Sequence, residues 1–149
     1  MAKLVGSGDR IGLFVLPFLL VGVPLNLRFP DFFAVGGPPV ALAVLSSIVL
    51  VPGVTAWAWS VVLILRHVPR DELITSGPYA LVKHPLYTAV ALLVLPWAGF
   101  LLDTWLGALL GLALYLGSRL FAPAEDAALA RTFGDRWEEY RSRVRLPWL

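Results

Sequence analysis

The sequence predicts an all-α protein, a polytopic membrane helix bundle of about four transmembrane helices with a C-terminal amphipathic helix. Of its 149 residues, 58% are apolar and 15% are charged. Soluble domains have about 45–50% apolar and about 25% charged residues, so both values point to a membrane. Apolar stretches of spanning length also recur along the chain, whose mean hydropathy is +0.78. We therefore expect residues 1–149 to form a single integral membrane domain.

Four stretches approach the roughly 20 apolar residues that a transmembrane helix needs. They are residues 11–27, 40–65, 86–102 and 105–121. The second contains Pro52-Gly53 near its middle, which fits one kinked helix and leaves two half-helices as the alternative. Pro96 predicts a kink in the third stretch. Asp103-Thr104 predicts a tight turn before the fourth, and either residue can cap that helix.

The N-terminus has some features of a secretory signal peptide, because Lys3 and Arg10 precede the first apolar stretch. That stretch continues well past a short signal-peptide core, and no clear small-x-small cleavage site follows it. We therefore predict a first span that is retained.

Basic residues indicate the orientation of the helices. The segment between the second and third spans carries Arg66, Arg70 and Lys83, whereas the segment between the first two carries Arg28 as its single base. Six arginines lie at the end of the fourth span and in the tail after it: Arg119, Arg131, Arg136, Arg141, Arg143 and Arg145. By the positive-inside rule, both termini and the middle segment are cytoplasmic. This placement accounts for the net charge of +2 better than a nucleic-acid partner does.

The chain has no cysteine, which excludes disulfides, thiolate chemistry and cysteine-type zinc sites. Its two histidines, His67 and His84, are too few to predict a metal site. The bias toward Ala, Leu, Val, Gly, Arg and Pro is typical of a GC-rich prokaryote, so we expect a prokaryotic inner membrane.

The tail, residues 122–149, is not a fifth span. It begins near Pro123, which suits the first turn of a helix. Apolar residues then recur at helical spacing: Leu129, Phe133, Trp137, Tyr140 and Val144. This stripe predicts an amphipathic helix that lies on the membrane interface or packs over the end of the bundle. Gly134 is a point at which this helix could break in two.

The middle loop, residues 76–87, interrupts the apolar pattern with polar and aromatic residues just before the third span. Gly77-Pro78 predicts a turn, and Pro85 is suited to the first helical turn. Between them the loop places Tyr79, Lys83, His84 and Tyr87. Such residues are also common at membrane surfaces without any chemical role, so the loop alone does not establish a site.

A second candidate segment is Glu125-Asp126, in the tail. Acidic residues are favoured near the N-terminus of a helix by its dipole, which is the structural alternative. The predicted topology, however, places these carboxylates on the same membrane face as the middle loop. We therefore expect the two segments to converge in a polar pocket, where a soluble cofactor meets a membrane substrate.

Together these segments resemble integral membrane methyltransferases, namely the isoprenylcysteine carboxyl methyltransferases and their phospholipid-methylating relatives. The resemblance covers about residues 73–149, whereas the N-terminal half shares only hydropathy. The family patterns are Gly-Pro-Tyr…Arg-His-Pro-x-Tyr, Glu-Glu-x-x-Leu…Phe-Gly, Tyr-x-x-Tyr-x-x-Arg-Val and a closing Pro-aromatic-aliphatic. The matching segments here are Gly77-Pro78-Tyr79, Lys83-His84-Pro85-x-Tyr87, Glu125-Asp126-x-x-Leu129-x-x-x-Phe133-Gly134, Trp137-x-x-Tyr140-x-x-Arg143-Val144 and Pro147-Trp148-Leu149.

The resemblance implies S-adenosylmethionine as the methyl donor and a lipid or lipid-linked acceptor, either an isoprenylcysteine-like carboxylate or a phospholipid amine. It implies His84, Glu125 and Arg143 as catalytic residues, with Arg143 near the acceptor. The residues that it implies for cofactor binding are Gly77, Pro78, Tyr79, Lys83, His84, Pro85, Tyr87, Glu125 and Asp126.

Three positions depart from the family pattern. Lys83 replaces an arginine and loses its bidentate geometry, Asp126 replaces a longer glutamate, and Ala89 replaces a glycine. Two alternatives stay open: an NADPH-dependent membrane reductase of the sterol reductase type, which has a similar Arg-His-Pro-x-Tyr segment, and a non-catalytic membrane scaffold. The Glu-Asp pair and the short chain favour the methyltransferase. The sequence leaves the acceptor, the need for a general base and the oligomeric state undetermined.

Overall fold

The computed structural model describes residues 7–146, so Lys3 and Pro147-Trp148-Leu149 lie outside the described residues. Three of its helices are long and apolar enough to cross a membrane: α1 (Gly8–Arg28), α3 (Pro39–His67) and α6 (Leu106–Phe133). A shorter apolar run consists of α4 (Pro85–Ala89), the π-helical η3 (Val90–Val94) and α5 (Leu95–Leu101). The predicted all-α membrane bundle is thus confirmed, and its third span is the shortest.

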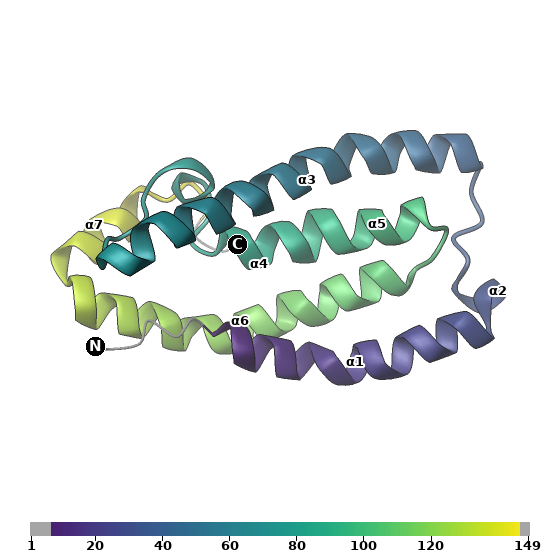
Figure 1. Cartoon of the computed structure of the whole chain (residues 1–149), viewed down its shortest axis with the longest axis horizontal. Helices are drawn as coiled ribbons and strands as arrows, with labels where there is room; N and C mark the ends of the chain where they lie inside the picture. The colour runs from purple at the N-terminus through teal and green to yellow at the C-terminus, as the bar shows by residue number, and fades with distance from the viewer. Residues whose placement is uncertain (1–6, 147–149) are drawn as a thin grey trace.

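The helices lie side by side along one long axis (Figure 1). α5 packs on α6, while α1 packs on α6 and α3 packs on α4, η3 and α5. α1 and α3 therefore form opposite sides of the bundle, with the α5–α6 pair between them. Large apolar side chains point outward from the long helices, among them Leu13, Val40, Leu65 and Leu120. This apolar exterior is what a lipid bilayer would surround.

Both internal prolines of the second and third spans are accommodated within continuous helix. α3 runs unbroken through Pro52, so it is one helix and not two half-helices. In the third span Pro96 lies at the start of α5, directly after the π-helical segment η3. Because proline has no N–H and its ring clashes with the carbonyl four residues earlier, a wider helical turn before it relieves that clash.

Small residues allow α5 and α6 to approach closely. A Cβ atom added at Gly107 would lie 2.1 Å from the Leu95 carbonyl oxygen. One added at Gly111 would lie 2.3 Å from the carbonyl oxygen of Ala91. Gly107 and Gly111 are four residues apart and share one helix face, as in the small-x-x-x-small pattern by which membrane helices pack.

One end of the bundle is closed by α2 (Pro30–Phe33) and the turn at Asp103-Thr104. Asp103 Oδ1 accepts backbone hydrogen bonds from Val35 at 3.2 Å and Gly36 at 3.1 Å. The Thr104 hydroxyl accepts a hydrogen bond at 3.1 Å from the backbone N–H of the first residue of α6. The N-cap position of α6 is Trp105, so Thr104 holds this N–H from one residue before the cap and is not the N-cap that the sequence predicted.

The prediction that a separate tail helix begins at Pro123 is wrong. α6 continues without interruption through Pro123 to Phe133, about three turns beyond the predicted end of the span. Residues 122–130 contain five alanines, the strongest helix formers, which favour continuation. The proline thus lies inside α6, and the carboxylates of Glu125 and Asp126 project from the same helix that crosses the membrane.

The amphipathic stripe of the tail forms one apolar cluster at the second end of the bundle. The helix breaks at Gly134, whose φ is +52°, as predicted, and α7 (Asp135–Arg143) follows. Trp137, Tyr140 and Val144 are buried, and Leu73, Tyr79, Leu129, Ala130 and Phe133 pack against them. α7 therefore packs over the end of the bundle, against η2 (Gly77–Ala80) in the middle loop and against Leu73, which follows η1 (Val68–Arg70).

We predict that Gly111→Ala destabilises the protein in detergent by about 1–3 kcal/mol, because the new methyl group overlaps the Ala91 carbonyl and overpacks the α5–α6 contact. Gly12→Ala is the matched control, since a Cβ atom at Gly12 meets no atom within 4 Å. Thermal unfolding of both variants in the same detergent measures the difference. A Gly111→Ala variant that melts with the wild type would disprove the close approach.

Candidate functional site

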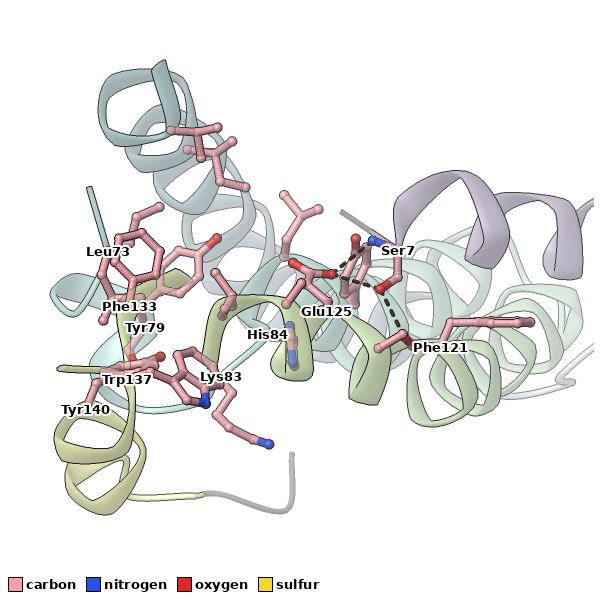
Figure 2. Close-up of a pocket in the computed structure, with 18 of the residues that line it drawn as sticks. Ser7, Leu73, Tyr79, Lys83, His84, Phe121, Glu125, Phe133, Trp137 and Tyr140 are labelled. Atoms are coloured by element: carbon pink, nitrogen blue, oxygen red, sulfur yellow. Dashed lines mark hydrogen bonds between the residues drawn. The ribbon is translucent and has the colours of Figure 1, made fainter. Parts of the chain in front are cut away.

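A cavity of about 490 Å³ lies at the end of the bundle that carries the middle loop and α7. Its walls come from the start of α1, the end of α3, the middle loop, α4, the second half of α6 and α7. Figure 2 shows an aromatic group of Tyr79, Phe133, Trp137 and Tyr140 on one side. On the other side lie Ser7, Phe121 and Glu125, with His84 between the two groups. The cavity is thus aromatic at one end and carries a carboxylate at the other.

The middle loop takes its shape from Gly77 and two prolines. Gly77 has a φ of +61°, which favours glycine, and a Cβ atom there would meet the Trp59 indole at 3.0 Å. Pro78 is buried, and its carbonyl accepts hydrogen bonds from the backbone N–H groups of Leu81 and Val82. Pro85 begins α4. These residues set the path that brings the polar side chains of the loop to the cavity.

Asp126 connects the loop to α6 through an ion pair with Lys83 and a hydrogen bond from His84. Its Oδ2 lies 2.6 Å from Lys83 Nζ, and its Oδ1 lies 2.8 Å from His84 Nε2. The three side chains are 23%, 17% and 12% exposed respectively, so water screens these contacts only in part. An ionised carboxylate can only accept, so His84 Nε2 carries a proton and donates it to Asp126. This contact fixes the imidazole ring at the cavity wall.

Glu125 is the next residue along α6, yet its carboxylate faces in another direction. Adjacent residues are about 100° apart around a helix, so the side chains of Glu125 and Asp126 point in different directions and contact different segments. Glu125 Oε2 accepts a hydrogen bond from the Ser7 backbone N–H at 3.0 Å and lies 3.0 Å from the Ser7 hydroxyl. Glu125 thus contacts the start of α1, whereas Asp126 contacts the middle loop.

Two phenols lie at the aromatic end of the cavity, Tyr140 buried and Tyr79 half-buried. Burial, together with the nearby Glu125 carboxylate, raises the pKa of Tyr79. Burial and the Asp126 carboxylate raise the pKa of Tyr140. Both phenols therefore stay protonated at neutral pH and serve as donors, and the Tyr140 hydroxyl donates a 2.8 Å hydrogen bond to the Tyr79 carbonyl. This bond attaches α7 to η2.

The structure brings five of the site residues predicted from the sequence to the cavity wall: Tyr79, Lys83, His84, Tyr87 and Glu125. The remaining four predicted cofactor residues support the wall from behind, either by shaping the loop backbone or, for Asp126, through its charged contacts: Gly77, Pro78, Pro85 and Asp126.

Arg143 lies elsewhere. Its side chain is 75% exposed and pairs with Glu139 along α7. It lines a neighbouring hollow of about 400 Å³, which shares Leu73 and Tyr140 with the main cavity. Arg143 is thus next to the cavity and separated from His84 by the aromatic group.

Sequence reasoning missed the part of the wall that comes from the N-terminal segment. Ser7, Asp9 and Arg10 line the cavity, and Glu72 lines it from the segment after η1. The charges at Asp9 and Arg10, just before the first apolar stretch, were a signal of a membrane boundary. Nothing in the sequence pairs Ser7 with Glu125, because 118 positions separate them.

The sequence model of the isoprenylcysteine carboxyl methyltransferase (ICMT) family matches residues 39–131. A search of curated proteins finds no match for the chain. The matched region includes His84 and Glu125, with the loop and the helix that carry them, and it leaves out Ser7 and Arg143. Because the match covers more than half of the 149 residues, the chain belongs to the isoprenylcysteine carboxyl methyltransferase family of integral membrane proteins.

Proposed function

We propose that the chain transfers a methyl group from S-adenosylmethionine to a lipid or lipid-linked acceptor, at the cavity between the middle loop and α6. The observation that carries this proposal is the convergence of His84 and Glu125 on one cavity. His84 lies just before α4, and Glu125 lies in the second half of α6, about 40 positions later. Family membership supports methyl transfer as the class of reaction.

The residues at the cavity fit this cofactor. The volume of about 490 Å³ lies within the usual range of roughly 300–1,000 Å³ for small-molecule sites. Glu125 can bind the ammonium of the methionine end. The faces of Tyr79, Tyr87 and Trp137 line the same space and can hold a sulfonium cation.

When bound, S-adenosylmethionine supplies a methyl group on a positively charged sulfur, which is open to in-line attack. The protein then acts chiefly by holding donor and acceptor in line, since positioning alone can account for much of such a rate. A carboxylate acceptor is already ionised at pH 7 and needs no base. For an amine acceptor a proton must leave, and His84 Nδ1 and the Glu125 carboxylate are the groups at the cavity wall that can accept it.

The lining of the cavity supports an acceptor that arrives from the bilayer. Much of the wall is apolar, and its helical parts include Ile64 near the end of α3 and Phe121 in α6. α1 and α3 lie on opposite sides of the bundle, and each contributes an end to the cavity. A long apolar chain could thus lie between these ends while its polar head meets His84.

Basic residues support a cytoplasmic position for the site. Arg66, Arg70 and Lys83 lie at the cavity end of the bundle, as do the arginines of α7. Under the positive-inside rule this end faces the cytoplasm, where a soluble donor is available.

The cofactor assignment predicts that Glu125→Gln weakens S-adenosylmethionine binding by roughly 10- to 150-fold, the range for losing one hydrogen bond between charged groups. Calorimetry on the purified protein in detergent measures it, with NADPH as a second ligand. Glu138→Gln is the matched control, since Glu138 lies on α7 with a side chain 63% exposed. If the wild type and Glu125→Gln bind S-adenosylmethionine with equal affinity, Glu125 does not contact the cofactor.

The acceptor role of Arg143 predicts a different pattern for Arg143→Ala. Because Arg143 lies outside the main cavity, cofactor affinity should stay within about twofold of wild type, while the KM for the acceptor rises. Arg141→Ala, which removes an arginine of similar exposure on the same helix, should leave both unchanged. Loss of cofactor binding in Arg143→Ala would contradict its assigned role.

The proposed orientation predicts opposite labelling of the two ends. The chain has no cysteine, so single cysteines can be introduced at Ser142 in α7 and Asp31 in α2 without a background signal. In intact cells a membrane-impermeant maleimide should label Asp31→Cys, and it should label Ser142→Cys only after lysis. The reverse pattern would place the cavity on the outer face.

A further inference from the structure

Glu125 is held by the residue that precedes α1. The Ser7 backbone N–H donates to Glu125 Oε2 at 3.0 Å, and the Ser7 hydroxyl lies 3.0 Å from the same oxygen. The hydroxyl is also 3.0 Å from the Phe121 carbonyl, one turn earlier on α6. Its single proton is therefore shared between two acceptors on one helix. Ser7 itself is only 9% exposed, so the contact is shielded from water.

Both contacts from Ser7 fall on the same oxygen of Glu125. Figure 2 shows the second carboxylate oxygen directed away from Ser7, toward the cavity. Within residues 7–146, no hydrogen-bond partner of that second oxygen is found. An ionised carboxylate has about four acceptor positions on its two oxygens, so ample capacity remains. Ser7 therefore fixes the orientation of the carboxylate and leaves one oxygen available to a ligand.

We propose that Ser7 is a positioning residue, which holds Glu125 so that its second oxygen meets the ammonium group of the cofactor. This rests on the proposed function, because it assumes that the cavity takes an amino-acid-bearing nucleoside. A free glutamate side chain would lose rotamer freedom on binding, whereas Ser7 imposes that order beforehand. Ser7 lies outside the matched region, residues 39–131, so the segment just before α1 would contribute this role to the site.

A competing interpretation is that the Ser7 donors occupy the place of the ligand ammonium and must leave when it binds. The two interpretations predict opposite signs. A positioning residue strengthens binding of an ammonium ligand, whereas a competitor weakens it. The direction of the second oxygen into the cavity favours positioning.

The test compares two adenine nucleosides that differ at the methionine end. S-adenosylhomocysteine carries the ammonium group, and 5′-methylthioadenosine lacks the whole amino-acid end. Calorimetry on the full chain in detergent should show Ser7→Ala binding S-adenosylhomocysteine about tenfold more weakly, a typical effect of losing a hydrogen bond to a charged group. Binding of 5′-methylthioadenosine should be unchanged, because it makes no contact that depends on Glu125.

Three further variants separate positioning from a general structural effect. Ser7→Thr keeps the hydroxyl and should restore affinity for S-adenosylhomocysteine. Ser7→Ala combined with Glu125→Gln should bind no more weakly than Glu125→Gln alone, because Ser7 acts only through Glu125. Ser142→Ala removes a serine hydroxyl on α7 that donates to the Glu139 carbonyl, and it should bind as the wild type does.

Each result decides the proposal. Equal or tighter binding of S-adenosylhomocysteine by Ser7→Ala would overturn the positioning role and leave the proposed function standing. Equal weakening for both nucleosides would also overturn it, as a general loss of structure. A folded wild type that binds neither nucleoside would overturn the proposed function and, with it, the role of Ser7.

Discussion

The contact of Asp126 with Lys83 and His84 is the constraint on which the rest of the site depends. This contact attaches the middle loop to α6, the helix that carries both carboxylates. All three side chains are largely shielded from water, so removing one partner would leave a charge poorly compensated. The loop backbone, set by Gly77 and the prolines, brings Lys83 and His84 to one place, and Asp126 holds them there. His84 therefore lines the cavity while its Nε2 proton is donated to Asp126.

Because of this constraint, the two neighbouring carboxylates have different roles. Asp126 is used for structure, which leaves Glu125, about 100° around α6, to face the cavity and the start of α1. Three segments far apart in the chain thus meet on two consecutive residues of one helix. That arrangement requires α6 to remain helical past Pro123, since a separate tail helix could place the pair at any angle to the bundle. The continuity of α6 is therefore a condition for the site as well as a detail of the fold.

The features that could be predicted from the sequence are those that depend on local pattern. Hydropathy located the four apolar segments, and helical spacing located the stripe that buries Trp137 and Tyr140. The continuation of α6 through Pro123 was not predicted, because Pro123 suits a helix start and alanine-rich neighbours outweighed that preference. The role of Ser7 could not be predicted, since a single serine before a span carries no signal until α1 packs on α6.

The two ends of the cavity differ in chemical character. Its carboxylate end lies beside the start of α1, and its aromatic end is closed by α7, which the Tyr140 hydroxyl attaches to the Tyr79 carbonyl. Arg143 lies beyond that aromatic group, in a hollow that shares Leu73 and Tyr140 with the cavity. Under the proposed function the donor would occupy the carboxylate end, and an acceptor would approach past the aromatic side chains or past the ends of α1 and α3. Because His84 lies between the two ends of the cavity, it is the side chain that both the proposed soluble donor and the proposed membrane-bound acceptor would meet.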